Sequence, residues 1–154
     1  MWWVVGVVVA VVLLATYVTW TAARFDRLHA RAASAGRALD AHLMRRAAAA
    51  AVLAETSGAM DLYAAARAAL DAHPDEREAA ENDLTKQLRV LSFDSDDALV
   101  VASRRVGLAR QVHNDLVRDA LAVRRRWLVR LLGMTRRHAA PAYFDVDDTT
   151  LDGT

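Results

Sequence analysis

An apolar run near the start of the chain restricts its fold more than any other feature of the sequence. Between Trp2 and Thr21 there is no charged residue, no proline and a single glycine. About 20 helical residues, each rising about 1.5 Å, cross the hydrocarbon core of a bilayer, which is about 30 Å thick. Amphipathic rings favour the headgroup level, and the run has Trp2 and Trp3 near one end and Trp20 near the other. We therefore expect residues 1–23 to form a transmembrane anchor.

A cleaved signal peptide is the alternative interpretation of the same run. Signal peptides have a basic n-region, a shorter apolar stretch and a cleavage site made of small residues. In this chain no basic residue precedes the run, the run is longer, and Ala22 and Ala23 offer a poor cleavage site. These features favour an anchor that is retained.

The arginines that follow the run predict its orientation. Arg24, Arg27, Arg31 and Arg37 come soon after its end, and no Lys or Arg precedes it. Positively charged residues mark the cytoplasmic end of a transmembrane helix. We therefore expect a single-pass protein with its N-terminus outside and residues 24–154 in the cytoplasm.

A helical repeat of apolar residues follows the anchor. Such residues recur every three or four positions from Phe25 to Leu53, which places them on one face of a helix. We expect the transmembrane helix to continue as one rod through residues 24–56. Ser57 and Gly58 then suit a helix end, because glycine readily adopts the left-handed conformation that follows a helix C-terminus.

Residues that end or begin helices divide the rest of the chain. The residue before Pro74 resists the α conformation, and the acidic residues just after this proline suit the first turn of a new helix. Ser95 is a good N-cap. Apolar residues then alternate by three and four from Leu99 to Trp127, as in a coiled-coil seam. The helices expected after the first one are 59–72, 75–91 and 96–132.

These helix lengths predict an all-α fold with two long and two short helices. Short connections place consecutive helices antiparallel. We therefore expect an antiparallel, up-and-down four-helix bundle over residues 24–133, followed by an acidic tail over residues 134–154. The alternative is a first helix that runs unbroken to Ala72, which would leave the apolar seam of the last helix unpaired over several turns.

Alignment of the two long helices at both ends predicts which side chains meet. Asp40 comes near Asn114 and within reach of Arg110, and these three make a polar rung that fixes the helix register. The same alignment places Arg46 near Leu108. It also returns the arginine-rich end of the last helix to the membrane, where each arginine gains about 1 kcal/mol from anionic lipid. The residues expected at the membrane interface are Trp2, Trp3, Trp20, Arg24, Arg27, Arg124, Arg125, Arg126, Trp127 and Arg130.

Several short motifs follow one another along the chain. They are LDAHLMRR at 39–46, LAET at 53–56, AENDL at 80–84, VGLARQVHND at 106–115 and PAYF at 141–144. In this order they resemble the LemA family of bacterial membrane-anchored helical proteins, although the family has tyrosine where this chain has His113. The resemblance implies one transmembrane helix, a short outer N-terminus, a helical cytoplasmic domain and a place in the bacterial inner membrane. It implies no particular biochemical activity.

The sequence offers no candidate for catalysis, cofactor binding or metal binding. The chain has no cysteine, which excludes disulfides, thiolate nucleophiles and Cys-based metal sites. Metal sites in helical bundles use Glu-x-x-His, whereas Arg110 stands three residues before His113, so a core histidine is expected. The aspartates from Asp145 to Asp148 resemble a calcium loop, but Thr150 stands where such a loop needs glycine. An acidic, solvated tail is expected there.

The many arginines invite comparison with nucleic-acid-binding proteins. Here they lie at the membrane-proximal end, lack interleaved aromatic residues and match no nucleic-acid motif, so anionic lipid headgroups are the expected partner. No small-molecule substrate is evident. The sequence therefore favours a non-catalytic scaffold or interaction module whose partner is another membrane protein, a second copy or the lipid surface. The alternative is a ligand-sensing module or an accessory subunit of a membrane enzyme or transport system, in which the polar rung binds a small molecule.

Overall fold

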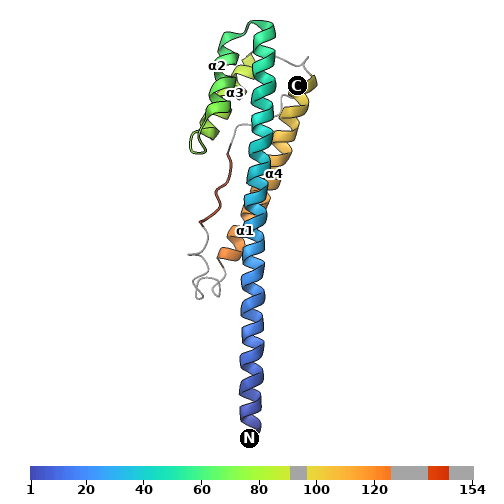
Figure 1. Cartoon of the computed structure of the whole chain (residues 1–154), viewed down its shortest axis with the longest axis vertical. Coiled ribbons are helices and arrows are strands. Elements are labelled where there is room, and N and C mark those ends of the chain that lie inside the picture. The colour runs from blue at the N-terminus through green and yellow to red at the C-terminus, as the bar shows by residue number, and fades with distance from the viewer. Residues whose placement is uncertain (91–96, 126–138, 146–154) are drawn as a thin grey trace. The chain divides into compact units, whose positions relative to one another are not determined.

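The computed structural model describes residues 1–90, 97–125 and 139–145. The helices in these ranges are α1 (Trp2–Ser57), α2 (Met60–Asp71), α3 (Arg77–Val90) and α4 (Asp97–Arg124) (Figure 1). The described ranges contain no strand. The expected all-helical chain with a long N-terminal helix is therefore confirmed for these residues, whereas the antiparallel order of a bundle stays a prediction.

α1 runs without interruption from the apolar run into the three-four repeat. It ends at Ser57, and Gly58 follows with a φ of 71°. The amide of Ala59 donates a hydrogen bond of 3.0 Å to the carbonyl oxygen of Ala54. This six-residue hydrogen bond around a left-handed glycine closes a helix C-terminus. The chain leaves the helix at the place where the sequence predicts a break, and α1 does not continue to Ala72.

The turn between α2 and α3 delays the start of α3. Ala72 has an extended backbone, with a ψ of 133°, that leads into the turn at Pro74. The amide of Glu76 then donates a 3.0 Å hydrogen bond to the His73 carbonyl oxygen. α3 therefore begins at Arg77, two residues later than expected. The expected continuation of α4 to residue 132 lies outside the described residues.

The chain divides into two compact units. The first unit comprises residues 1–34 and 115–142, and the second unit comprises residues 35–114 and 143–154. α1 and α4 are each divided between the two units. Each unit has its own apolar clusters, so each is described by itself.

In the first unit the apolar face of α1 packs on the C-terminal turns of α4. Phe25 is buried in one small cluster with Val123. Ala32 is buried in another with Val117 and Ala120. These α1 and α4 residues, except Val117, belong to the three-four repeats from which the two long helices were predicted.

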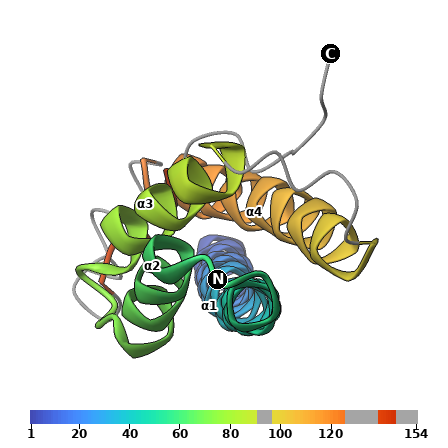
Figure 2. The same ribbon diagram turned by 90° about the horizontal axis from the view of Figure 1, so that it is seen from above.

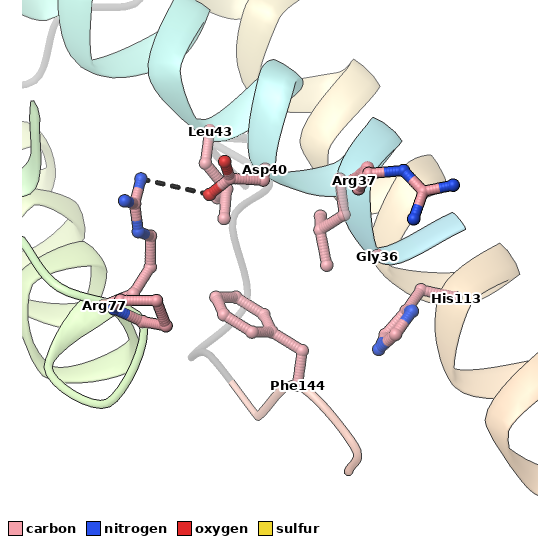
Figure 3. Close-up of a pocket in the computed structure, with 9 residues that line it drawn as sticks. Gly36, Arg37, Asp40, Leu43, Arg77, His113 and Phe144 are labelled. Atoms are coloured by element: carbon pink, nitrogen blue, oxygen red, sulfur yellow. Dashed lines mark ion pairs between the residues drawn. The ribbon is translucent and has the colours of Figure 1, made fainter. Parts of the chain in front are cut away.

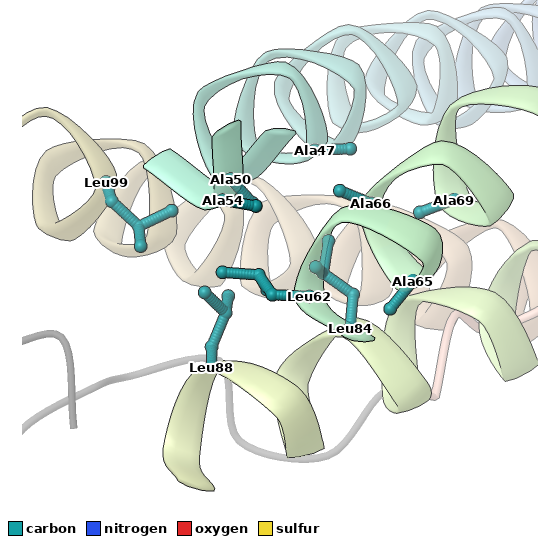
Figure 4. Packing of buried hydrophobic residues seen from close by; sticks show 10 residues of the cluster. All are labelled: Ala47, Ala50, Ala54, Leu62, Ala65, Ala66, Ala69, Leu84, Leu88 and Leu99. Atoms are coloured by element: carbon teal, nitrogen blue, oxygen red, sulfur yellow. The ribbon is translucent and has the colours of Figure 1, made fainter. Parts of the chain in front are cut away.

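In the second unit all four helices contribute to a core that is mostly alanine and leucine. α2 and α3 lie side by side (Figure 2). Alanine buries little area, and burial contributes about 0.8 kcal/mol per CH₂ group, so the leucines supply most of the apolar stabilisation. The buried members of this core (Figure 4) are Ala47, Ala50, Ala54, Leu62, Ala65, Ala66, Ala69, Leu84, Leu88 and Leu99.

Candidate functional site

A buried ion pair joins α1 to α3 in the second unit. The Nη2 atom of Arg46 donates hydrogen bonds to Glu81 Oε2 at 2.5 Å and to Thr85 Oγ1 at 3.0 Å. The same atom donates to the backbone carbonyl oxygen of Glu81 at 3.3 Å. Arg46 is 1 % exposed and Glu81 is 0 % exposed. The two helices therefore enclose both charges of the pair together with a hydroxyl group.

Burial raises the pKa of the Glu81 carboxyl, because the surrounding protein disfavours its charged form. The charge and hydrogen bond of Arg46 lower this pKa, as does the charge of Arg77, but burial outweighs them. Removal of one partner from a buried ion pair leaves the other charge uncompensated in a dry environment. The packing of α3 on α1 therefore depends on both Arg46 and Glu81 being present.

A second ion pair lies nearer the surface of the same unit. Arg77 Nη1 is 3.1 Å from Asp40 Oδ1, with Arg77 13 % exposed and Asp40 57 % exposed. Arg77 also donates to the Ala72 carbonyl oxygen at 2.8 Å and to the sulfur of Met44 at 3.1 Å. As the first residue of α3, Arg77 ties the turn between α2 and α3 to α1.

A pocket of about 540 Å³ lies beside the Asp40–Arg77 pair. In Figure 3 the ring of Phe144 points toward α1, with Arg77 on one side of it and His113 on the other. Ligand sites are typically mostly apolar pockets of about 300–1,000 Å³ with a few polar groups, and this pocket fits that description. The residues that line it are Gly36, Arg37, Leu39, Asp40, Leu43, Pro74, Arg77, His113 and Phe144.

Residues 143–145 are held in the second unit by hydrogen bonds to their backbone. Asn114 Nδ2 donates to the Phe144 carbonyl oxygen at 3.1 Å, and the Phe144 amide donates to Asn114 Oδ1 at 3.0 Å. One side-chain amide therefore engages both main-chain polar groups of one residue. The amide of Asp145 donates to Glu78 Oε1 at 3.2 Å. Together these bonds fix the segment to α3 and α4.

Two residues of the predicted polar rung, Asp40 and Asn114, take part in these contacts. Asp40 forms its ion pair with Arg77, and Asn114 holds the backbone of Phe144. The sequence alone identified neither Arg77 nor Phe144 as a partner of these residues. A direct contact of Asp40 with Arg110 and Asn114 stays a prediction.

His113 faces α1 at the edge of the pocket. A methyl group added at Gly36 would lie 3.4 Å from the ring carbon Cε1 of His113, which is ordinary van der Waals contact. Among the described residues no group of three or more His, Asp or Glu side chains is arranged to hold a metal ion. The expectation of a chain without metal or cofactor stays a prediction.

The residues expected at the membrane interface are described in part. In the first unit Trp20, Arg24 and Arg27 help to line a cleft of about 310 Å³. The guanidinium carbon of Arg24 lies 5.6 Å from the centre of the Trp20 ring, within range of a cation–π contact. Trp2, Trp3, Arg124 and Arg125 are also described, and Arg126, Trp127 and Arg130 lie outside the described residues.

The motifs that resemble the LemA family supply most of the residues of this site. They contribute Asp40 and Arg46 from α1, Glu81 from α3, Asn114 from α4 and Phe144 from the C-terminal segment. The order of the motifs does not say which side chains touch. The signal for the buried ion pair is that an arginine stands on the apolar face of the first predicted helix, where a charge needs a partner.

Comparisons with known proteins leave the interpretation to the geometry. No protein-family model matches the chain, and neither does any curated protein or solved structure. The resemblance to the LemA family therefore stays a prediction from the motifs. The features that bear on function are the apolar part of α1 and the site in the second unit.

Proposed function

We propose that the chain is a single-pass membrane protein of the LemA type that acts as a non-catalytic scaffold or interaction module at the cytoplasmic membrane face. The observation that carries this proposal is the exposed apolar run of α1. Its valine and leucine side chains are 46 % exposed at Val4 and up to 65 % exposed at Leu13. Only 6 % of the most apolar stretch of α1 is buried. A continuous apolar surface of this length is unfavourable in water and favourable in lipid.

The charged residues after the run support an orientation with the second unit in the cytoplasm. Arg24, Arg27 and Arg31 line one cleft directly after the apolar run. Arginines in this position favour the cytoplasmic side of an inner membrane and gain from its anionic lipids. The proposed location is the bacterial inner membrane, with anionic headgroups as one partner.

The proposed architecture is an antiparallel, up-and-down four-helix bundle. Contacts inside the first unit support it, because Phe25 of α1 clusters with Val123 of α4 and the later Ala32 clusters with the earlier Val117. The lengths also support it. α1 and α4 have 56 and 28 residues, and the two helices between them have 12 and 14.

The pairing of charges supports a non-catalytic role. Asp40 and Glu81 each lie against an arginine, so their charges contribute to holding the helices together. A scaffold of this kind presents a surface to another membrane protein or to a second copy. The pocket of about 540 Å³ favours the second candidate function, a ligand-sensing or accessory subunit of a membrane enzyme or transport system.

Extraction of membranes with alkaline carbonate tests the anchor. We expect the full chain to stay in the membrane pellet, and the double variant Val8→Arg, Val12→Arg to move to the supernatant, because each arginine costs about 2.5–3.5 kcal/mol at the centre of a bilayer. Val52→Arg is the matched control, since Val52 is an exposed valine of the same helix outside the apolar run. Release of the unaltered chain by carbonate, or retention of the double variant, contradicts the proposal.

A further inference from the structure

The contacts of residues 143–145 have the features of peptide recognition. The side-chain amide of Asn114 forms hydrogen bonds with both the N–H and the C=O of Phe144, much as a neighbouring strand does in a sheet. These main-chain groups are common to every non-proline residue, so this part of the contact does not depend on sequence. The carboxylate of Glu78 adds a third main-chain contact at Asp145.

Only one side chain of the bound segment, that of Phe144, contacts the pocket closely enough to be selected by it. Two aromatic residues are adjacent in the segment, and they lie in different surroundings. Phe144 lines the pocket and packs on the cluster of Leu39, Leu43 and Val106. Tyr143 is 48 % exposed. An extended segment with one aromatic side chain therefore satisfies both parts of the site.

The ring of Phe144 forms part of the wall of the pocket and leaves open space beside it. A space of about 540 Å³ lies beside the ring of Phe144 and is lined by other residues as well. The wall around this space is apolar at Leu39 and Leu43 and polar at the Asp40–Arg77 pair. The site can therefore accept an aromatic side chain that is larger than phenylalanine.

We propose that this site binds an extended peptide segment of a partner protein, with an aromatic side chain in the pocket and its backbone on Asn114, and that residues 143–145 of the same chain occupy the site until the partner displaces them. The inference deepens the proposed interaction module, on which it rests, by naming the class of segment that the module takes. A tethered segment acts at an effective concentration of about 1 mM, so a free peptide must compete with it. Removal of the ring of Phe144 should therefore open the site to peptides in solution.

Fluorine NMR tests displacement in the unaltered chain. The chain has three phenylalanines, and full-length protein labelled with para-fluorophenylalanine in detergent micelles gives Phe144 a signal that the variant Phe144→Tyr identifies. The probe is an unlabelled peptide with the sequence of residues 139–148. We expect excess peptide to move the Phe144 signal to the position of a solvent-exposed ring, and the same peptide with alanine in place of phenylalanine to leave it unchanged. A Phe144 signal that moves with protein concentration alone would place the segment of a second copy in the site and overturn occupancy within one chain.

Binding of the same peptide, labelled with a fluorophore, tests the competition. We expect Phe144→Ala to bind it about tenfold or more tightly than the unaltered chain. Tyr143→Ala should bind it no more tightly, because Phe144 lines the pocket and packs on the cluster of Leu39, Leu43 and Val106, whereas Tyr143 is exposed. Adding Asn114→Asp to Phe144→Ala should weaken binding about tenfold, because a carboxylate cannot donate to the peptide carbonyl. Far-UV circular dichroism checks that each variant keeps its helices, and if one does not, the NMR displacement decides.

Equal binding to all the variants, or no displacement and no binding at millimolar peptide, overturns the inference. Membrane retention in carbonate does not depend on Phe144. A chain that stays in the membrane but takes no peptide therefore refutes the peptide site alone, whereas a chain that is released from the membrane refutes the anchor.

Discussion

The two halves of α1 are parts of one regular helix, and they differ in what surrounds them. From Val4 to Leu14 the helix presents valine and leucine side chains on all sides, and these stay exposed. From Leu39 to Ala54 the same helix buries one face against α2, α3 and α4 and also encloses the charge of Arg46. In the proposed membrane anchor the first half needs only an apolar solvent, whereas the second half packs on particular neighbours.

Under the proposed function this one helix serves as an anchor in its first half and as part of a packed unit in its second half. A helix inside a bilayer needs only apolar side chains, so many different sequences could form the first half of α1. A packed unit that encloses an ion pair requires complementary residues on its other helices. Substitutions should therefore be judged by which half they fall in, and single variants test that distinction, from the largest expected effect to the smallest.

Arg46→Ala should lower the free energy of unfolding of the second unit by about 3–5 kcal/mol, because Glu81 then keeps a buried charge without its partner. The neighbouring Arg45 is exposed, so Arg45→Ala is a matched control that should change the free energy by less than about 0.5 kcal/mol. Urea unfolding of the full chain in detergent, followed by circular dichroism, measures both. Equal effects of the two substitutions would mean that Arg46 is not enclosed as described.

Leu43→Ala should destabilise the second unit by about 2–5 kcal/mol, because it removes buried methyl groups and leaves a cavity. Leu13→Ala on the apolar half should leave the same urea transition unchanged, since the Leu13 side chain is 65 % exposed among the described residues. The pair of leucines compares the two halves of α1 directly. A similar loss of stability for both would indicate that the apolar run is part of a protein core.

The pKa of Glu81 predicts a pH dependence that is specific to the buried pair. Because the folded-state pKa is raised above the ordinary value of 4.5, the folded chain holds this proton more tightly than the unfolded chain. Between 4.5 and the raised folded pKa, the stability of the unaltered chain should therefore fall with rising pH relative to Glu81→Gln, by at most about 1.4 kcal/mol per pH unit. Urea unfolding of both proteins from about pH 4 to about pH 8 measures the difference. A relative stability that rises with pH in this window contradicts the stated direction.

Gly36 within α1 and Gly58 just after its end should respond to substitution in opposite directions. Gly36→Ala should stabilise the second unit by up to about 1 kcal/mol, because the added methyl group makes ordinary contact with His113 and alanine favours helix. Gly58→Ala should destabilise it by about 1–2 kcal/mol, because Gly58 has a positive φ. Thermal unfolding of the two variants measures both changes. A stabilising Gly58→Ala would contradict the left-handed helix end.

The sequence was sufficient for features that depend on one helix at a time. The apolar run, the three-four repeat from Phe25 and the helix end at Gly58 all follow from local composition and spacing. The repeat also identified the face of α1 that becomes buried, since Phe25, Ala32, Leu39 and Leu43 all lie on it.

The sequence was not sufficient for contacts between helices. Alignment of the long helices placed Arg46 near Leu108, which stays a prediction, and it did not reveal that the hydrogen bonds of Arg46 go to Glu81 and Thr85 on a short helix. A repeat shows which face a residue occupies but not which neighbour it meets across that face. The position of Phe144 could not be predicted either, because a short segment without periodicity does not indicate where it packs. Its position depends on the hydrogen bonds of Asn114 to its backbone.

Labelling of single cysteines with a membrane-impermeant maleimide tests the central claim most directly, since the unaltered chain has no cysteine to interfere. Val8→Cys lies in the apolar run and Val52→Cys lies at an exposed position of the covered half. We predict that cysteine 8 is labelled neither in intact cells nor in inverted membrane vesicles, and that cysteine 52 is labelled only in the vesicles. Labelling of cysteine 8 from water, or of cysteine 52 in intact cells, would contradict an α1 that lies in lipid at one end and in the cytoplasm at the other.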